Sequence, residues 1–513
     1  MINKNLYYYL LPFFLGIITS FSLPPYNLIL INFLTFPLFF IFFIQIQKNK
    51  SLLLNFVFGW LFGFGYFISN IYWIIYSLTF EDIFKPLIPF ALIIIPSFLG
   101  LFYGLITLIL SKFNLNKNLS SILIFSLVFS IIEFFRGFIF GGFPWNLIVY
   151  SWSNYINSLQ ILSIIGTYSF NLISITFFLL PILIWYEKKG LFKLFIFIMI
   201  LSILFINNFY GSIKIKNNKK FFNDLENLSL KIISPKISID RFFQENNEID
   251  IIKELINLSN PDKSKSTIFI FPEGALTGIS LESLSSFKDL FFEKFSENHI
   301  IIMGINTEKT FDEKDLEIYN SLVVLDHNLN LIHNYKKNKL VPFGEFLPLE
   351  NFLKKIGFKK VTKGYKSFSA GTYRDTIFIK KNNFSFIPLI CYEIIYSGKI
   401  SKTLDDTNFI VNISEDGWFG DSIGPYQHFS HSVFRAIEEG KNIIRSSNNG
   451  ISGYIDSNGI VIERLESTQS GVIEVNNYKK LERTIFSRFG NKIFFYFIIF
   501  YISLTFLIYK RGS

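Results

Sequence analysis

The first 209 residues alternate long apolar runs with short polar connections. Seven apolar runs can be distinguished there, at about 6–22, 27–46, 52–77, 87–111, 119–139, 158–186 and 191–209, and an eighth covers 491–509. Most of them are close to the ~20 residues that a helix needs to cross about 30 Å of hydrocarbon. The pattern predicts a membrane α-helical bundle with about eight spans.

Residues 210–488 show a different pattern, in which short apolar stretches alternate with polar ones. Stretches with the length and composition of buried strands lie at 228–233, 267–271, 300–305, 321–325, 384–390 and 409–413. Helical patterns at 245–258 and 284–297 alternate with some of them. We expect one α/β domain with helices over its sheets. The chain then divides into seven membrane helices (1–209), an α/β domain (210–488) and a last membrane helix with a short tail (489–513).

The basic residues between the apolar runs predict the orientation of the bundle. They gather at alternate ends of the helices and after the last one: Lys4, Lys48, Lys50, Lys112, Lys117, Lys188, Lys189, Lys510 and Arg511. The opposite connections hold mainly Lys85 and Arg136. Because lysine-rich connections stay in the cytoplasm, both termini are expected inside and the α/β domain outside. The first run lacks a small-residue cleavage site and is predicted to be an uncleaved anchor.

Composition supports a membrane protein and excludes some partners. Hydrophobic residues make up 50% of the chain and charged residues 17%, which is typical of a chain lying largely in lipid. The net charge of +10 is assigned to cytoplasmic connections and lipid-facing surface, because the sequence has no basic, aromatic-interleaved motif for nucleic acid. With one cysteine in 513 residues, an intramolecular disulfide is not possible.

That cysteine, Cys391, follows the predicted strand 384–390 and precedes the polar pair Tyr392 and Glu393. A thiol at such a strand-to-helix turn would face backbone N–H groups and the positive end of a helix dipole. Both favour the thiolate, which is the form that attacks a carbonyl carbon. On this stretch alone, an inert buried thiol fits equally well.

Two further stretches place charged side chains after strands. Glu273 follows the strand 267–271 and suits general-base chemistry, although most such residues are simply solvated. Lysines at 336, 337 and 339 lead into an apolar turn that ends in Glu345. A lysine there can stabilise an oxyanion. A basic surface loop is the alternative.

The order Glu, Lys and Cys-Tyr-Glu, each at the end of a strand, resembles the nitrilase superfamily, whose enzymes use a Glu-Lys-Cys triad on an αββα sandwich. Eight spans with the domain inserted before the last one resemble, within it, the apolipoprotein N-acyltransferase family. Leu-Val-Pro-Phe-Gly-Glu at 340–345, Cys-Tyr-Glu at 391–393, Asp-Gly-Trp-Phe-Gly-Asp at 416–421 and Arg-Ser-Ser-Asn-Asn-Gly at 445–450 stand as that family has them. The resemblance covers essentially the whole chain.

Carried over by position, the resemblance implies that Glu273 is the base, Cys391 the nucleophile and Lys337 the oxyanion-stabilising lysine, with Lys336 and Lys339 as its rivals. The accessory residues that it implies are Glu345, Tyr392, Glu393 and Trp418. It also implies a membrane α-helical bundle joined to a nitrilase-like αββα sandwich, with neither cofactor nor metal.

Three departures from the family pattern affect the expected shape of the substrate entrance but not the triad. The first strand of the domain ends in Ser-Pro-Lys at 234–236 instead of a Gln-containing turn. The tryptophan that is expected near Arg241 and Phe242 is missing, and Glu415 replaces an asparagine.

The resemblance implies ping-pong acyl transfer at a bacterial cytoplasmic (inner) membrane, with the catalytic domain on the periplasmic face. A fatty acyl group would pass from a phospholipid, through a Cys391 thioester, to the N-terminal amine of a diacylglyceryl-cysteine on an apolipoprotein. No nucleic acid is expected as a partner. Two other classes stay open: a membrane-tethered carbon–nitrogen hydrolase, with water as acceptor, and a transporter or scaffold, which would not need the triad.

Two features have open interpretations. Residues 351–361 alternate apolar residues with four lysines, which suits a lid at the lipid headgroups or a solvated surface helix. Glu133 and Arg136 form a candidate intramembrane ion pair beside the turn 141–146. That pair is expected to mark a substrate pathway or to act as a structural clasp.

Overall fold

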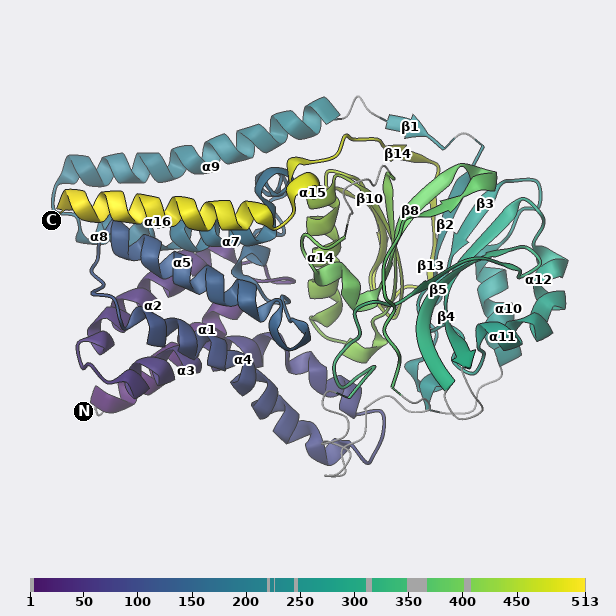
Figure 1. Ribbon diagram of the computed structural model, residues 1–513, viewed down its shortest axis with the longest axis horizontal. Coiled ribbons are helices and arrows are strands. Elements are labelled where there is room, and N and C mark those ends of the chain that lie inside the picture. Colours follow the sequence, from purple (N-terminus) through teal and green to yellow (C-terminus); the bar gives the residue numbers. More distant parts are fainter. Residues whose placement is uncertain are drawn as a thin grey trace.

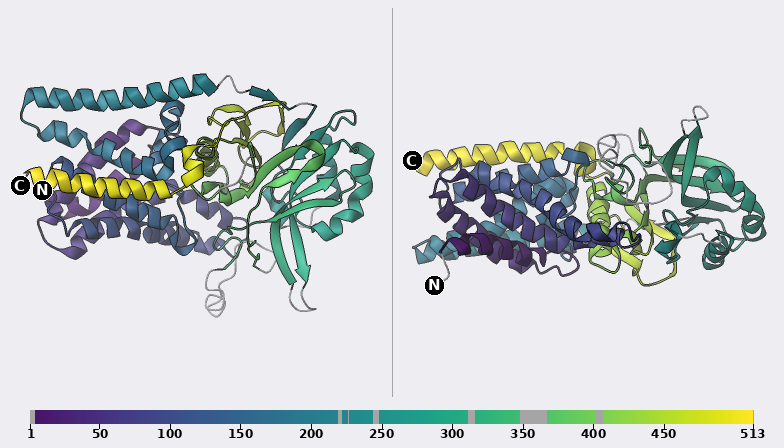
Figure 2. Two further views of the ribbon diagram at one scale, coloured as in Figure 1. Left: turned by 45° about the horizontal axis from the view of Figure 1, so that its top comes forward. Right: turned by 90° about the horizontal axis from the view of Figure 1, so that it is seen from below.

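The structure, a computed structural model, describes residues 4–218, 222–225, 227–243, 248–310, 316–347, 367–400 and 407–512. A helical bundle lies at one end of the long axis and an α/β domain at the other (Figure 1). The N and C marks both lie at the end of the bundle that is away from the α/β domain (Figures 1 and 2). The chain therefore leaves the bundle once, forms the domain and returns.

Every predicted apolar run is helical. The bundle consists of α1 (Lys4–Ser20), α2 (Asn32–Gln47), α3 (Leu52–Asn70), α4 (Ile88–Leu110), α5 (Leu119–Arg136), α7 (Leu162–Leu179), α8 (Pro181–Tyr186), α9 (Gly190–Asn218) and α16 (Lys492–Gly512). Six helices in the described ranges are long and apolar enough to cross a membrane, and two shorter apolar ones cover Tyr8–Ser20 and Lys492–Ile508. The predicted helical bundle is confirmed.

Local sequence explains where these helices begin and how closely they pack. The Ser51 side chain accepts a hydrogen bond from the Leu54 N–H at the start of α3, and Asn118 does the same for Ser121 at the start of α5. Small residues let helices approach closely. A Cβ at Gly59 of α3 would lie 2.2 Å from the Thr107 hydroxyl of α4.

The α/β domain contains two six-stranded sheets. One has the order β12-β11-β10-β9-β8-β7 and the other β13-β2-β3-β4-β5-β6. The first comprises β7 (Ile377–Ile379), β8 (Phe384–Ile390), β9 (Phe409–Glu415), β10 (Asn442–Asn448), β11 (Ser452–Ile455) and β12 (Val461–Leu465). The second comprises β2 (Ser229–Ser234), β3 (Thr267–Ile270), β4 (His299–Thr310), β5 (Leu316–Asp326), β6 (Leu331–Lys336) and β13 (Gly471–Val475). A short pair, β1 (Phe222–Asp224) and β14 (Asn477–Lys479), lies beside them.

Helices cover the two outer faces of these sheets. The helices α10 (Glu248–Ser259), α11 (Leu281–Leu284) and α12 (Lys288–Lys294) lie on the side away from the bundle. Helix α14 (Gly424–Glu439) lies between the bundle and the first sheet (Figure 1). The predicted αββα sandwich is confirmed. The helical stretch predicted at 284–297 is found with different bounds: the Ser280 cap starts α11 at Leu281, a 3-10 turn at Ser285–Phe287 follows, and α12 ends at Lys294.

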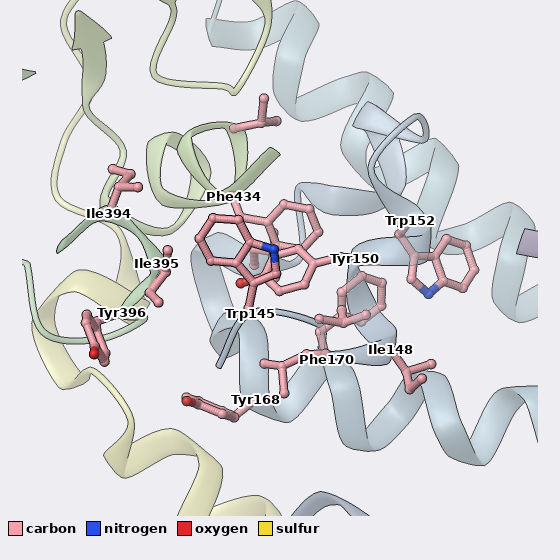
Figure 3. Close-up of a cluster of buried hydrophobic side chains, with 14 of the residues drawn as sticks. Trp145, Ile148, Tyr150, Trp152, Tyr168, Phe170, Ile394, Ile395, Tyr396 and Phe434 are labelled. Carbon is pink, nitrogen blue, oxygen red and sulfur yellow. The ribbon is translucent and has the colours of Figure 1, made fainter. Parts of the chain in front are cut away.

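A continuous hydrophobic core joins the bundle to the first sheet. Figure 3 shows Trp145, Tyr150 and Phe170 from the bundle side close to Ile395 and Phe434 from the domain. The other core lies between the second sheet and α10 to α12. Because its first core is shared with the bundle, the α/β domain cannot turn freely on the membrane part.

Candidate active site

Three predicted site residues lie directly after strands. Glu273 follows β3, Lys337 follows β6, and Cys391 follows β8 and begins the 3-10 helix η9 (Cys391–Ile395). The strands β3 and β6 belong to one sheet and β8 to the other. The charges of Glu273 and Lys337 both act on the Cys391 thiol, so the fold brings the three residues together.

Lys337 is buried between two carboxylates. Its Nζ lies 3.2 Å from Glu273 Oε1 and 2.9 Å from Glu345 Oε1. The Asn320 amide donates to the same two oxygens, at 2.6 and 2.8 Å. Burial opposes the charge of Lys337, but the two carboxylates outweigh it and raise the pKa of the lysine well above its usual value. Lys337 is therefore a fixed cation.

The two rival lysines lie elsewhere. The Lys336 Nζ lies 3.4 Å from the centre of the Tyr319 ring. The side chain of Lys339 is exposed, and its backbone N–H donates to Glu393 Oε1 at 3.1 Å. Of the three lysines, Lys337 is the one whose ammonium contacts Glu273.

The Cys391 thiol is buried and neutral at rest. Burial raises its pKa, the Glu273 carboxylate raises it further, and Lys337 opposes both. The expectation that the helix terminus favours a standing thiolate is therefore wrong, because desolvation exceeds the effect of one short 3-10 turn. Cys391 also has φ +49°, a left-handed conformation that is rare for a residue with a Cβ. The strand-to-helix turn thus holds a strained residue.

Glu393 ties the ends of two strands together. Its Oε1 accepts hydrogen bonds from the Tyr335 hydroxyl (2.7 Å) and the Asn338 N–H (2.9 Å), and Arg374 Nη2 lies 3.0 Å away. Its Oε2 accepts from the Ile390 N–H at 2.9 Å. Glu393 therefore fixes the Lys337 turn against the Cys391 turn.

The other accessory residues flank the triad. Glu345 Oε2 accepts from the Val341 N–H at 2.8 Å, which closes the turn that carries this carboxylate. Trp418 is half-buried and packs on Phe242, Phe243 and Phe80, with ring centres 5.1 to 6.1 Å apart. The proposed lid at 351–361 lies outside the described residues.

Glu415, one of the departures noted in the sequence, contacts Arg241, which lies in the stretch of another. Arg241 and Glu415 form a buried ion pair, and Arg241 Nε also donates to the Gly274 carbonyl at 3.0 Å. The Glu415 N–H donates to Glu273 Oε2 at 3.0 Å. Burial raises the pKa of Glu415, while Arg241 acts in the opposite direction. The pair therefore supports the residues on both sides of Glu273.

Sequence reasoning missed a buried polar network behind Cys391. His428 of α14 places Nε2 3.3 Å from the Cys391 carbonyl oxygen and Nδ1 2.9 Å from Asp416 Oδ1. Arg445 Nη2 donates to Asp416 Oδ2 at 2.8 Å and to His428 Nδ1 at 3.0 Å. Only weak indications of these residues were present in the sequence. His428 is one of five histidines, and Asn320 is an amide beside an apolar stretch.

Cys391, Asp416 and His428 also have ligand atoms within 4.8 Å of one another, which is close enough for a metal ion. Arg445 already contacts both Asp416 and His428. A metal cation between these residues would be repelled by the Arg445 guanidinium. Both imidazole nitrogens of His428 already have hydrogen-bond partners. The arrangement fits a hydrogen-bonded support for the Cys391 turn better than a metal centre.

Together, these groups suit covalent acyl transfer. A neutral thiol lies next to a carboxylate that can accept its proton, and a permanent cation can stabilise an oxyanion. The buried surroundings would shield an acylated thiol from water.

Comparisons with known proteins agree with this chemistry. A family model described as apolipoprotein N-acyltransferase N-terminal domain matches residues 15–180, and one described as carbon-nitrogen hydrolase matches residues 243–477. A Rickettsia typhi protein named apolipoprotein N-acyltransferase is 34% identical over 479 residues, covering 90% of this chain and 91% of its own. A Brucella melitensis protein of that name is 30% identical over 477 residues, covering 90% and 88%.

Solved structures align with about half of the chain. A carbon-nitrogen hydrolase superfamily protein from Xanthomonas campestris aligns with 49% of this chain and 90% of its own, at 14% identity and a TM-score of 0.33.

Proposed function

The chain belongs to the apolipoprotein N-acyltransferase family, so it catalyses N-acylation of lipoproteins, and we propose that it does so by ping-pong transfer through Cys391. The observation that carries this route is the contact of Lys337 with Glu273 and Glu345 next to a buried, neutral thiol. A membrane phospholipid is the acyl donor. The acceptor is the amine of a diacylglyceryl-modified N-terminal cysteine.

The first half-reaction forms a thioester. Glu273 accepts the proton from Cys391 Sγ, and the thiolate attacks the ester carbonyl of the phospholipid. Lys337 Nζ and the Tyr392 N–H hold the tetrahedral oxyanion. When this intermediate collapses, the carbon–oxygen ester bond breaks and protonated Glu273 returns its proton to the departing alcohol. The products are acyl-Cys391 and a lysophospholipid.

The second half-reaction transfers the acyl group to nitrogen. The acceptor amine attacks the thioester carbonyl, and the same cation and N–H hold the second oxyanion. Glu273 takes a proton from the amine and passes it to the departing Cys391 sulfur. An amide forms, the carbon–sulfur bond breaks and the enzyme returns to its starting state.

The bundle gives both substrates a place in the bilayer. The protein is a membrane protein, and Cys391 belongs to the hydrophobic core that the domain shares with the bundle. We place the bundle in the inner membrane of a bacterium and the domain, residues 210–488, on the periplasmic face, on the strength of the lysine distribution. Donor and acceptor would then reach the thiol without leaving the membrane.

Intact-mass measurement of the purified full-length protein tests this route. Incubation with phospholipid alone should add one fatty-acyl mass to Cys391 in a linkage that hydroxylamine cleaves, and Cys391→Ala should add none. A peptide with a diacylglyceryl-modified N-terminal cysteine should discharge the adduct and gain the acyl group on its amine. Steady release of free fatty acid without peptide would support a hydrolase instead, and no adduct under any condition would exclude the thioester route.

A further inference from the structure

The 3-10 helix η9, which begins with Cys391, is fastened to the membrane bundle by two tyrosine hydroxyls. Tyr392 donates to the Gly142 carbonyl at 2.7 Å. Tyr396 donates to the Gly141 carbonyl at 2.9 Å and to the Gly142 carbonyl at 3.1 Å. Both acceptors belong to the turn 141–146, which follows α5. The nucleophile turn therefore rests on a segment about 250 residues away in sequence.

The turn 141–146 has a backbone conformation that residues other than glycine rarely adopt. Gly141 and Gly142 have φ +90° and +80°, which favours glycine. A Cβ at Gly142 would lie 2.2 Å from the Gly137 carbonyl oxygen. The carbonyls that receive the tyrosine hydroxyls thus depend on whatever holds this turn in place.

Arg136, at the end of α5, holds it. Its Nη1 donates to the Phe143 carbonyl at 2.5 Å and its Nη2 to the Asn146 carbonyl at 3.5 Å. The Phe143 N–H donates back to the Arg136 carbonyl at 2.9 Å. The Tyr66 hydroxyl also donates to the Asn146 carbonyl, at 3.1 Å. One guanidinium therefore spans the turn from Phe143 to Asn146.

Glu133 in turn holds Arg136. Its Oε1 lies 3.5 Å from Arg136 Nη2, and both side chains are 1% exposed. Tyr103 donates to Glu133 Oε1 at 3.0 Å and Asn171 to Oε2 at 2.6 Å. Burying an ion pair costs desolvation free energy, and charged residues inside membrane bundles commonly have a functional role. Neither charge contacts a member of the triad.

The same turn reaches the other side of Cys391. Trp145 Nε1 donates to Gln427 Oε1 at 2.8 Å. Gln427 precedes His428, whose Nε2 lies 3.3 Å from the Cys391 carbonyl oxygen. The turn 141–146 thus supports the nucleophile both through η9 and through α14.

We propose that Glu133 and Arg136 are positioning residues, which hold the turn 141–146 so that Tyr392 and Tyr396 fix the strained Cys391 turn in its reactive geometry. Strained conformations persist only where the surroundings over-determine them. If η9 were less firmly held, the enzyme would still bind its substrates, but the thiol would be misaligned with the ester carbonyl. Loss of the positioning contacts should therefore lower kcat and leave KM nearly unchanged. The proposal rests on Cys391 being the acyl carrier.

The test compares acyl transfer by the full-length protein and three variants. Tyr396→Phe removes one hydroxyl and keeps the ring. Glu133→Gln/Arg136→Met removes both charges together, so no buried charge is left alone. Tyr501→Phe is the matched control, since it removes a bundle hydroxyl that lies 3.0 Å from Thr176, away from the turn. We expect Tyr396→Phe to lower kcat about tenfold, with KM within about twofold, and Tyr501→Phe to leave both unchanged.

Coupling separates positioning from general destabilisation. Because the charge pair and Tyr396 act through one turn, adding Tyr396→Phe to Glu133→Gln/Arg136→Met should cost little further activity. A normal kcat for Tyr396→Phe, or losses that multiply in the combined variant, would overturn the proposal. If the charge-pair variant does not fold, the kcat of Tyr396→Phe decides alone. A wild-type protein that forms no acyl adduct would instead remove the premise and fail the proposed function itself.

Discussion

Lys337 Nζ lies closer to Glu345 Oε1, at 2.9 Å, than to Glu273 Oε1, at 3.2 Å. The accessory carboxylate is thus the first partner of the lysine. Its contribution, with that of Glu273, raises the pKa of Lys337 against the effect of burial. In the proposed mechanism the lysine stays charged, so the proton transfers fall to Glu273, whose Oε2 accepts a hydrogen bond from the Glu415 N–H at 3.0 Å.

Replacing Lys337 should therefore slow the chemistry without loosening lipid binding. Lys337→Ala removes one oxyanion donor, and losing such a donor typically costs ~10²–10³ in rate. The rate of acyl-adduct formation at Cys391, followed by intact mass, measures this loss. Lys336→Ala is the matched control, since its ammonium lies on the Tyr319 ring. Equal losses in the two variants would show that Lys337 has no special role.

The pH dependence of Cys391 alkylation should report how the thiol loses its proton. In the wild type, the proton passes to Glu273 within the site, so the iodoacetamide rate should change little between about pH 7 and 9. In Glu273→Gln the proton must leave to solvent. Burial raises the pKa of the thiol, so the variant's rate should rise about tenfold per pH unit over this range.

The sign of the effect at high pH gives a second check. The Glu273 carboxylate raises the pKa of Cys391, so removing its charge lowers that pKa and favours the thiolate. Glu273→Gln should therefore alkylate more slowly than the wild type near pH 7 and close the difference near pH 9. The measurement is clean, because the chain has one cysteine. Parallel profiles for the two proteins would mean that Glu273 is not the proton acceptor.

Topology has its own test. A reporter that is active only in the cytoplasm should be silent when it is fused after Asn218, where α9 ends, because the lysine distribution places the following domain outside. The same reporter fused after Ser513 should be active and serves as the control. Activity after Asn218 would contradict both the orientation and a reaction on the outer face.

The positions of Glu273 and Cys391 after strands could be predicted because each follows a short apolar stretch with a clear end, whereas Lys337 was identified by resemblance alone, since Leu331–Lys336 is half polar. Glu273, Lys337 and Cys391 lie one to three residues after β3, β6 and β8. By contrast, β10 was missed because Asn-Ile-Ile-Arg-Ser-Ser-Asn has little of a strand's apolar pattern, yet all seven residues are buried. Several of their polar side chains pair with residues on other elements, as Arg445 does with Asp416 and Asn448 with Glu415.

The contacts between the bundle and the domain also could not be predicted from the apolar pattern of the sequence. Gln427 receives a hydrogen bond from Trp73, 354 residues earlier, and η9 rests on the turn 141–146. Periodicity reports which side of an element is apolar, but it does not report which element that side meets. The length of α9 was also not predictable from the apolar pattern. The helix continues past the apolar run to Asn218, and its Gly211 packs against the Asn157 carbonyl.

The pair formed by Arg241 and Glu415 leads to a stability prediction. Each side chain is almost fully buried. Glu415→Asn, which introduces the residue that the resemblance implies there, would remove the carboxylate that pairs with the buried guanidinium. Breaking one side of a buried pair typically costs ~3–5 kcal/mol. We therefore expect a clear fall in the thermal unfolding midpoint of the purified protein.

The double variant Arg241→Met/Glu415→Gln decides whether charge pairing is the cause. It removes both charges and keeps much of the volume, so most of the lost stability should return, because paired charges can be replaced at little net cost. Acyl-adduct formation should return with it, since the residue 415 N–H that holds Glu273 Oε2 is backbone. A double variant as unstable as Glu415→Asn would mean that residue 415 matters through its own hydrogen bonds to Asn448 and Gly417, and not through Arg241.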